Sequence, residues 1–192
     1  YKLLDFLNIL VGFKNEFLFG DEITSNIIFE NRLQFKINWE TGQKTGFFLD
    51  QRENRSLLRK YVKDKKVLNT FSYSGGFSVY ALKAGATMVH SVDVSQKAID
   101  LVDENVRLNF SQTQNHQAYT ADVFDFLEKQ TSEYDVIVLD PPAFAKHLSA
   151  KNQAVKGYQR LNALAMKQIK KGGIIFTFSC SQVIDRELFY NT

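Results

Sequence analysis

The chain has very little cysteine, and this limits the covalent chemistry open to the protein. Cys180 is the only cysteine among 192 residues, so no internal disulfide can form. The three histidines, His90, His116 and His147, are scattered and do not show the spacing of zinc ligands. The sequence therefore predicts a reduced, cytoplasmic protein with no metal site.

Long hydrophobic runs are also missing. The most apolar early stretch, residues 3–11, is interrupted by Asp5 and Asn8 and is too short to cross a bilayer. We therefore expect no membrane association and no cleavable leader before this stretch. The net charge of +3 permits an anionic partner such as nucleic acid but does not require one.

From residue 66 onward, short apolar runs alternate with amphipathic stretches. The runs predict strands at 67–71, 88–93, 116–121, 134–140 and 173–179, and the stretches predict helices at 76–84, 95–109, 123–130 and 152–170. Strands separated by helices need crossover connections, which produce a parallel sheet with helices on both faces. The sequence therefore predicts an α/β fold with a doubly wound, Rossmann-like sheet.

A hairpin and one further helix are predicted ahead of this sheet. Residues 22–39 contain two β-rich runs broken at Glu30 and Asn31, the pattern of a β-hairpin. We divide the chain into a linker segment with this hairpin, residues 1–45, and a main domain, residues 46–192.

The helix predicted at 49–62 should lean against the sheet. Asp50 is expected as its N-cap, and Glu53, three residues later, would complete a capping box. Its apolar face is predicted to consist of Leu57, Leu58 and Tyr61.

The first strand-to-helix turn lacks the glycines of a dinucleotide site. It reads NTFSYSGGFSVYAL, with Gly75 and Gly76 adjacent, and does not supply the Gly-x-Gly-x-x-Gly pattern that lets backbone approach a pyrophosphate. Ligands of doubly wound sheets bind at the carboxyl ends of the strands. A ligand without phosphates is therefore favoured at this turn.

Acidic residues end the next two strands. Asp93 ends the second, where a carboxylate can take both hydroxyls of a ribose. Asp122 and the amide of Val123 follow the third and could face the amine and a ring nitrogen of adenine. Ribose and adenine without pyrophosphate indicate S-adenosylmethionine. The same strand ends add Phe71, Tyr73, Gly75, Val94 and Asp140 to the predicted cofactor-binding set.

Each of these signals also has a structural interpretation. Two adjacent glycines often form an ordinary tight turn. An acidic residue after a strand often caps the following helix, and Asp122 is placed to do so.

Proline is nearly absent, and the two prolines of the chain, Pro141 and Pro142, directly follow Asp140. Successive prolines remove two backbone donors and force an extended turn. Such a loop could hold a planar base through hydrogen bonds to Asp140 and stacking on Phe144, with Lys146 as a further substrate contact. The structural alternative is a strand-terminating turn.

The single thiol lies at the end of the fifth predicted strand, in the stretch GGIIFTFSCS. Carbon 5 of a pyrimidine is a poor nucleophile, and a thiolate that attacks carbon 6 activates it. A lone cysteine is usually a packed core residue. The flanking Ser179 and Ser181 argue against a fully apolar site, so we favour Cys180 as a nucleophile.

These residues resemble the class I S-adenosylmethionine-dependent RNA methyltransferases, and among them the bacterial large-subunit (23S) ribosomal RNA 5-methylcytosine family. The similarity runs from about residue 38 to the end, through GQKTGFFLDQRENR, NTFSYSGGFSVYALKAGA, VDVS, DVFDFL, DPPAFAK and FSCS. It implies that Asp93 binds ribose, that Asp122 and Val123 bind adenine, that Asp140 orients the target base and that Cys180 is the nucleophile.

The resemblance also implies contacts that spacing alone does not give. It places the segment with Gln51 and Arg55 over the methionine part of the cofactor and near the substrate. For Arg55 the alternatives are a solvated helix face or phosphate contacts. The implied partner is ribosomal RNA, and a homodimer is compatible with the sequence. Members of this family usually carry an N-terminal PUA domain and further strands after the fifth. We therefore expect this sequence to lack the PUA domain and those last strands of the family pattern.

Three hypotheses about function remain open at this point. The first is a methyltransferase that acts on carbon 5 of a cytosine in large-subunit ribosomal RNA. The second is a methyltransferase that acts on a nitrogen, in RNA guanine or another substrate, with Cys180 only packed. The third is a non-catalytic module that binds RNA or a nucleotide.

Overall fold

A computed structural model describes residues 26–37, 46–111, 115–129 and 133–192 of the chain. The apolar stretch at 3–11, most of the linker segment and position 130 of a predicted helix lie outside the described residues. Within the described ranges, no helix is both long enough and apolar enough to cross a membrane.

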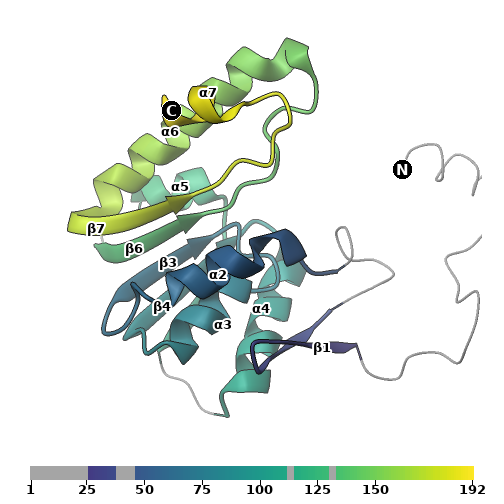
Figure 1. Ribbon diagram of the computed structural model, residues 1–192. Coiled ribbons are helices and arrows are strands. Elements are labelled where there is room, and N and C mark those ends of the chain that lie inside the picture. Colours follow the sequence, from purple (N-terminus) through teal and green to yellow (C-terminus); the bar gives the residue numbers. More distant parts are fainter. Residues whose placement is uncertain (1–25, 38–45, 112–114, 130–132) are drawn as a thin grey trace, which may run out of the picture.

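The core of the fold is a sheet of five parallel strands (Figure 1). Its order is β5-β4-β3-β6-β7, so the chain builds outward from β3 on one side and then returns to add β6 on the other. The strands are β3 (Lys66–Thr70), β4 (Met88–Asp93), β5 (His116–Thr120), β6 (Tyr134–Leu139) and β7 (Ile169–Thr177). The predicted doubly wound α/β sheet is confirmed, and it follows from apolar runs that can be buried on both faces.

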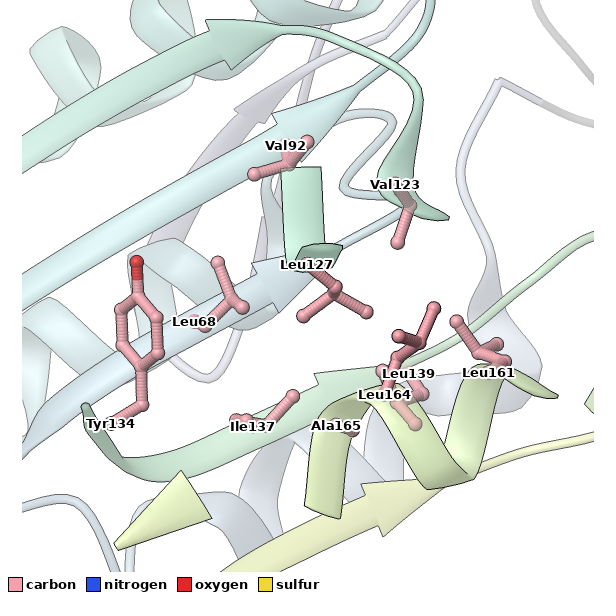
Figure 2. Packing of buried hydrophobic residues seen from close by; sticks show 10 residues of the cluster. All are labelled: Leu68, Val92, Val123, Leu127, Tyr134, Ile137, Leu139, Leu161, Leu164 and Ala165. Carbon is pink, nitrogen blue, oxygen red and sulfur yellow. The ribbon is translucent and has the colours of Figure 1, made fainter. Parts of the chain in front are cut away.

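Helices cover both faces of the sheet. On one face α5 (Val123–Lys129) and α6 (Lys151–Gln168) pack against β3 and β6, and Figure 2 shows Leu127 and Leu161 meeting Leu139 there. On the other face, buried side chains of α2 (Arg52–Leu58) and α3 (Gly76–Lys83) pack against β3, β4 and β6. The helix α4 (Gln96–Asn109) packs beside α3, and α7 (Arg186–Tyr190) ends the chain. Each large apolar side chain buried in this way contributes about 1.5–3 kcal/mol.

The predicted hairpin is present and packs against the main domain. Its strands are β1 (Ile27–Glu30) and β2 (Leu33–Lys36), and its turn lies at Asn31 and Arg32, one residue later than predicted. Both turn residues have positive φ, 50° and 67°, the geometry whose twist matches a two-residue hairpin. Phe35 is fully buried in the cluster between the hairpin, α3 and α4.

The predicted helix at 49–62 differs in the structure. A short 3-10 turn, η1 (Leu49–Gln51), precedes α2, and neither start has a side-chain cap. Asp50 therefore lies inside a turn and not ahead of a helix, so the capping box is wrong. Leu58 and Val62 are buried, whereas Leu57 and Tyr61 are 40% and 43% exposed.

The start of the last strand was also predicted wrongly. The helix α6 ends at Gln168, and β7 begins at once with Ile169. Tyr134 of β6 pairs with Ile169 of β7, whereas Val136 pairs with Ile174, so the register shifts between these two pairs. Gly172, whose φ is +80°, lies in this part of β7. A left-handed glycine accommodates the extra residues of such a bulge.

A buried ion pair joins the hairpin to α2. The guanidinium of Arg55 donates from Nε and Nη2 to the two carboxylate oxygens of Glu30, each at 2.8 Å, and from Nη1 to the carbonyl of Phe48 at 2.9 Å. The hydroxyl of Tyr80 donates to Glu30 at 2.9 Å. Burial, and next the bond to Glu30, raise the pKa of Tyr80 to about 12, so this hydroxyl remains a donor well into the alkaline range.

Replacing Arg55 should destabilise the fold strongly. In Arg55→Ala, Glu30 is left buried without its counter-charge, and we expect the free energy of unfolding to fall by about 3–5 kcal/mol. Urea unfolding measures this loss. Arg59, four residues later, is exposed and provides a control. The free energy of unfolding of Arg59→Ala should stay within about 0.5 kcal/mol of the wild-type value. Equal losses in the two variants would contradict the structural importance of the pair.

Candidate active site

A cleft of about 660 Å³ lies along the carboxyl ends of β3, β4 and β6. Because β3 stands between β4 and β6, the connections that leave these strands diverge here, which is where doubly wound sheets bind ligands. The predicted site residues that line the cleft are Gln51, Arg55, Phe71, Tyr73, Asp93, Val94, Asp140, Pro141, Pro142 and Cys180. The sheet thus brings together the expected residues at the ends of β3, β4, β6 and β7, but not Gly75, Asp122 or Val123.

The loop between β3 and α3 has an unusual backbone. Phe71, Tyr73 and Gly75 have φ values of 52°, 45° and 73°, all in the left-handed region. For a residue with a side chain this conformation costs roughly 1–2 kcal/mol. It persists only where surrounding contacts impose it, and such strain tends to cluster at ligand sites. Here the amide of Tyr73 is held by Asp93 at 3.0 Å.

Packing explains both glycines of this loop. A Cβ on Gly75 would lie 3.0 Å from Val102 Cγ1, and one on Gly76 would lie 3.0 Å from Arg55 Cδ. Gly75 is not among the residues that line the cleft. The structure therefore gives these glycines a packing requirement, and the predicted cofactor contact of Gly75 stays a prediction.

Asp93 lines the cleft and is held in a fixed orientation. Its Oδ2 accepts from the amide of Tyr73 and its Oδ1 from the amide of Ser95, each at 3.0 Å. A carboxylate has about four acceptor positions, so each oxygen can accept a further donor. Val94, beside it, is 72% exposed and offers an apolar surface next to this acceptor.

Ser72 provides a direct test of whether the cleft suits a polar ligand. Its hydroxyl is buried and has no hydrogen-bond partner among the described residues, and the residue lines the cleft. A buried hydroxyl without a partner is costly. A ligand with ribose or amino-acid groups would supply one, so the residues fit the predicted cofactor. No sequence pattern singled out Ser72.

Asp122 and Val123 lie away from this cluster. Asp122 accepts from the amide of Asp125 at 3.1 Å and so caps α5, as its structural interpretation predicted. The side chain of Val123 is buried in the core between the sheet and α5. Neither residue lines the cleft, and their predicted adenine contacts stay predictions.

The loop after β6 places Asp140 opposite α2. Gln51 Nε2 donates to Asp140 Oδ1 at 2.9 Å, and Asn54 donates to Gln51 Oε1 at 2.7 Å. Gln51, expected beside the methionine part of the cofactor, therefore orients the carboxylate that was predicted to hold the base. Asn54, three residues after Gln51, was not predicted.

The thiol and the proline loop meet at this end of the cleft. Cys180 is exposed, and its Sγ lies 3.7 Å from the carbonyl oxygen of Pro141. Pro141 is buried and Pro142 is exposed. Asp140, the two prolines and Cys180 thus form one wall, as expected for the ends of neighbouring strands.

Three predicted substrate contacts have other surroundings. The ring of Phe144 packs on Tyr158, with centroids 4.6 Å apart, and does not line the cleft. Lys146 is exposed and lies outside the lining. Arg55 reaches the cleft, but its guanidinium is buried in the pair with Glu30, which rules out a solvated helix face.

Titratable groups elsewhere in the described part of the chain give no sign of a metal centre. Within the described ranges, no group of three or more histidine, cysteine, aspartate or glutamate side chains could hold a metal ion. Burial lowers the pKa of both His90 and His116, and these rings bond to Tyr134 and Ser91 respectively. They serve the packing of the sheet.

Comparison with known proteins identifies close relatives. A family model described as S-adenosylmethionine-dependent methyltransferase matches residues 12–188. The Ribosomal RNA large subunit methyltransferase I of Vibrio parahaemolyticus is 43% identical over 178 residues, which is 90% of this chain and 45% of the relative. The protein of the same name from Aeromonas salmonicida is 43% identical over 166 residues, 85% of this chain and 42% of the relative. The chain thus spans less than half the length of these relatives.

Solved structures agree in fold. A methyltransferase crystallised in complex with SAH superposes with a TM-score of 0.80 at 30% identity, over 91% of this chain and 47% of that one. A SAM-dependent methyltransferase from Streptococcus mutans gives 0.78 at 28% identity, over 91% and 46%.

Removing the carboxylate of Asp93 should weaken binding of S-adenosylhomocysteine. Asp93→Ala removes charge-assisted hydrogen bonds, for which we expect a loss of about 1.5–3 kcal/mol, or roughly 10–150-fold in Kd. Titration calorimetry measures it. Asp125→Ala, on the exposed side of α5, serves as the control and should bind as wild type does. Unchanged affinity in Asp93→Ala would contradict the ribose contact.

Proposed function

The chain belongs to the S-adenosylmethionine-dependent methyltransferase family, and we propose that it methylates carbon 5 of a cytosine in large-subunit ribosomal RNA. The observation that carries this proposal is the exposed thiol of Cys180 in the wall of the cleft, beside Asp140 and Pro141. Relatives more than 40% identical are named as large-subunit ribosomal RNA methyltransferases, which supports RNA as the substrate class.

Residues on the β3 and β4 side of the cleft would hold the cofactor. Asp93 would accept from the ribose hydroxyls, the buried hydroxyl of Ser72 would gain a partner, and the exposed Val94 would lie against the adenine. When bound, S-adenosylmethionine supplies an electrophilic methyl group. The constrained backbone at Phe71 and Tyr73 keeps this side of the cleft preorganised.

Cys180 would activate the base from the other side. Its thiolate adds to carbon 6 of the cytosine, forming a carbon–sulfur bond and moving the electron pair of the 5,6 double bond to carbon 5. After methylation, carbon 5 loses its proton, the double bond reforms, and the carbon–sulfur bond breaks to release the thiolate. An exposed thiol suits this reaction, whereas a cysteine that only packed would be buried.

Asp140 would recognise the base. Cytosine carries an exocyclic amine that donates hydrogen bonds, and a carboxylate is its natural acceptor. Gln51 occupies one position on Oδ1 and so fixes the plane of the carboxylate. The neighbouring prolines hold the loop in one direction. This arrangement would hold the ring by its edge at Asp140 and leave a face of the ring open to Cys180, since the thiolate must approach carbon 6 perpendicular to the ring plane.

A mechanism-based trap tests the role of the thiol. On RNA that carries 5-fluorocytosine at the target, the adduct cannot eliminate after methyl transfer, because fluorine does not leave as a proton does. We expect the protein to form a gel-stable adduct with this RNA, and Cys180→Ala to form none and to lose methylation while binding S-adenosylhomocysteine normally.

Serine at the same position provides the matched control. Cys180→Ser preserves the size of the side chain but is a far weaker nucleophile, so it should also form no adduct. If Cys180→Ala still methylates RNA, the nucleophile is wrong and methylation of a nitrogen becomes the better hypothesis, which mass mapping of the modified nucleoside would identify.

Asp140→Ala should separate base recognition from cofactor binding. We expect turnover on RNA to fall by roughly 10–100-fold, since a hydrogen bond to a charged group is lost, while affinity for S-adenosylhomocysteine changes less than about twofold. Gln51→Ala should reduce turnover in the same direction but less. Collapse of cofactor affinity in Asp140→Ala would assign this carboxylate to the cofactor side of the cleft.

A further inference from the structure

Three hydroxyl groups meet behind the Cys180 loop. Tyr158 of α6 is fully buried, and its hydroxyl oxygen lies 3.0 Å from the hydroxyl oxygens of both Ser181 and Ser179. These two serines flank the cysteine in the sequence. The amide of Ser181 also donates to Ser179 Oγ at 3.3 Å. The loop is therefore tied to one side chain on both sides of its thiol.

The same tyrosine supports the loop that carries Asp140. The amide of Ala145 donates to Ser181 Oγ at 3.4 Å, and the ring of Phe144 packs against the ring of Tyr158. Gly157 permits this packing, because a Cβ there would lie 2.9 Å from Phe144 Cδ2. The loops after β6 and β7 thus rest on one turn of α6.

We infer that Tyr158 is a positioning residue for the thiol of Cys180, an inference that rests on the proposed function. Tyr158 does not line the cleft, so it acts only through the two serines and through Phe144. Its contacts fix where Sγ lies relative to the carbonyl of Pro141 and so to the base-binding loop. A misplacement of about 1 Å in such a site can cost on the order of 100-fold in rate.

This position explains why serines flank the cysteine. A hydroxyl on each side lets the loop hold to a buried tyrosine while the thiol between them stays exposed. A purely structural role for these hydrogen bonds would affect stability alone. A positioning role must also change the reactivity of the thiol. Measuring that reactivity therefore distinguishes the positioning role from the structural role.

The experiment compares two tyrosine variants. Tyr158→Phe keeps the ring against Phe144 and removes the hydroxyl. Tyr134→Phe is the matched control, because Tyr134 is also fully buried and its hydroxyl bonds to His90 at 2.8 Å, but it lies at the amino end of β6, away from the cleft. Two readouts are needed: the rate of alkylation of Cys180 by iodoacetamide from about pH 6 to about pH 10, and kcat and KM on RNA.

In Tyr158→Phe we expect alkylation at least about threefold faster, because the loop loses two hydrogen bonds, and kcat at least about tenfold lower with KM within about twofold. Tyr134→Phe should match wild type in both readouts despite a similar loss of stability. Ser179→Ala removes one of the two bonds to Tyr158 and also the bond from the amide of Ser181. It should change both readouts in the same directions, and it replaces Tyr158→Phe if that variant does not fold.

Alkylation and kcat in Tyr158→Phe that match those of Tyr134→Phe would overturn the inference. Because alkylation requires neither RNA nor methyl transfer, its outcome is independent of the proposed reaction. A changed alkylation profile supports the positioning role even if Cys180→Ala retains methylation, in which case it is the proposed function that fails.

Discussion

The architecture of the cleft depends on the contacts made by the side chain of Arg55. Its guanidinium binds Glu30 of the hairpin and the carbonyl of Phe48 and lies over the ring of Phe47. Its aliphatic part lies where any side chain at Gly76 would have to go. One residue of α2 thus joins the hairpin, the segment before η1 and the first turn of α3. Because the pair is buried, its geometry is enforced by the high cost of leaving either charge without a partner.

The position of α2 in turn decides what faces the proline loop. Gln51 precedes α2 directly, and its amide reaches across the cleft to Asp140. On the far side, α6 holds the Cys180 loop through Tyr158. The two groups proposed to act on the base are therefore oriented from different parts of the chain, Asp140 by Gln51 at the start of α2 and the Cys180 loop by Tyr158 of α6.

Several predicted site residues make contacts that the sequence did not reveal, and these contacts share one cause. Asp122 caps α5, and Phe144 packs inward on Tyr158, although both follow strands whose ends point to the cleft. A strand end determines which edge of the sheet a residue occupies. The direction of its side chain depends on the helix packed next to it. Arg55 shows the same effect, since its partner Glu30 lies on a hairpin whose docking no local pattern reveals.

The sequence by itself determined the parallel sheet, the order of its helices and the gathering of Asp93, Asp140 and Cys180 at one edge. Hydrophobic periodicity is a local property, and crossover connections have one favoured hand, so these features follow without tertiary information. Only the tertiary structure decided which side chains orient them, as Gln51 does for Asp140 and Tyr158 for the thiol loop. Those contacts join residues far apart in the chain, and they form because burial requires each polar group to find a partner in three dimensions.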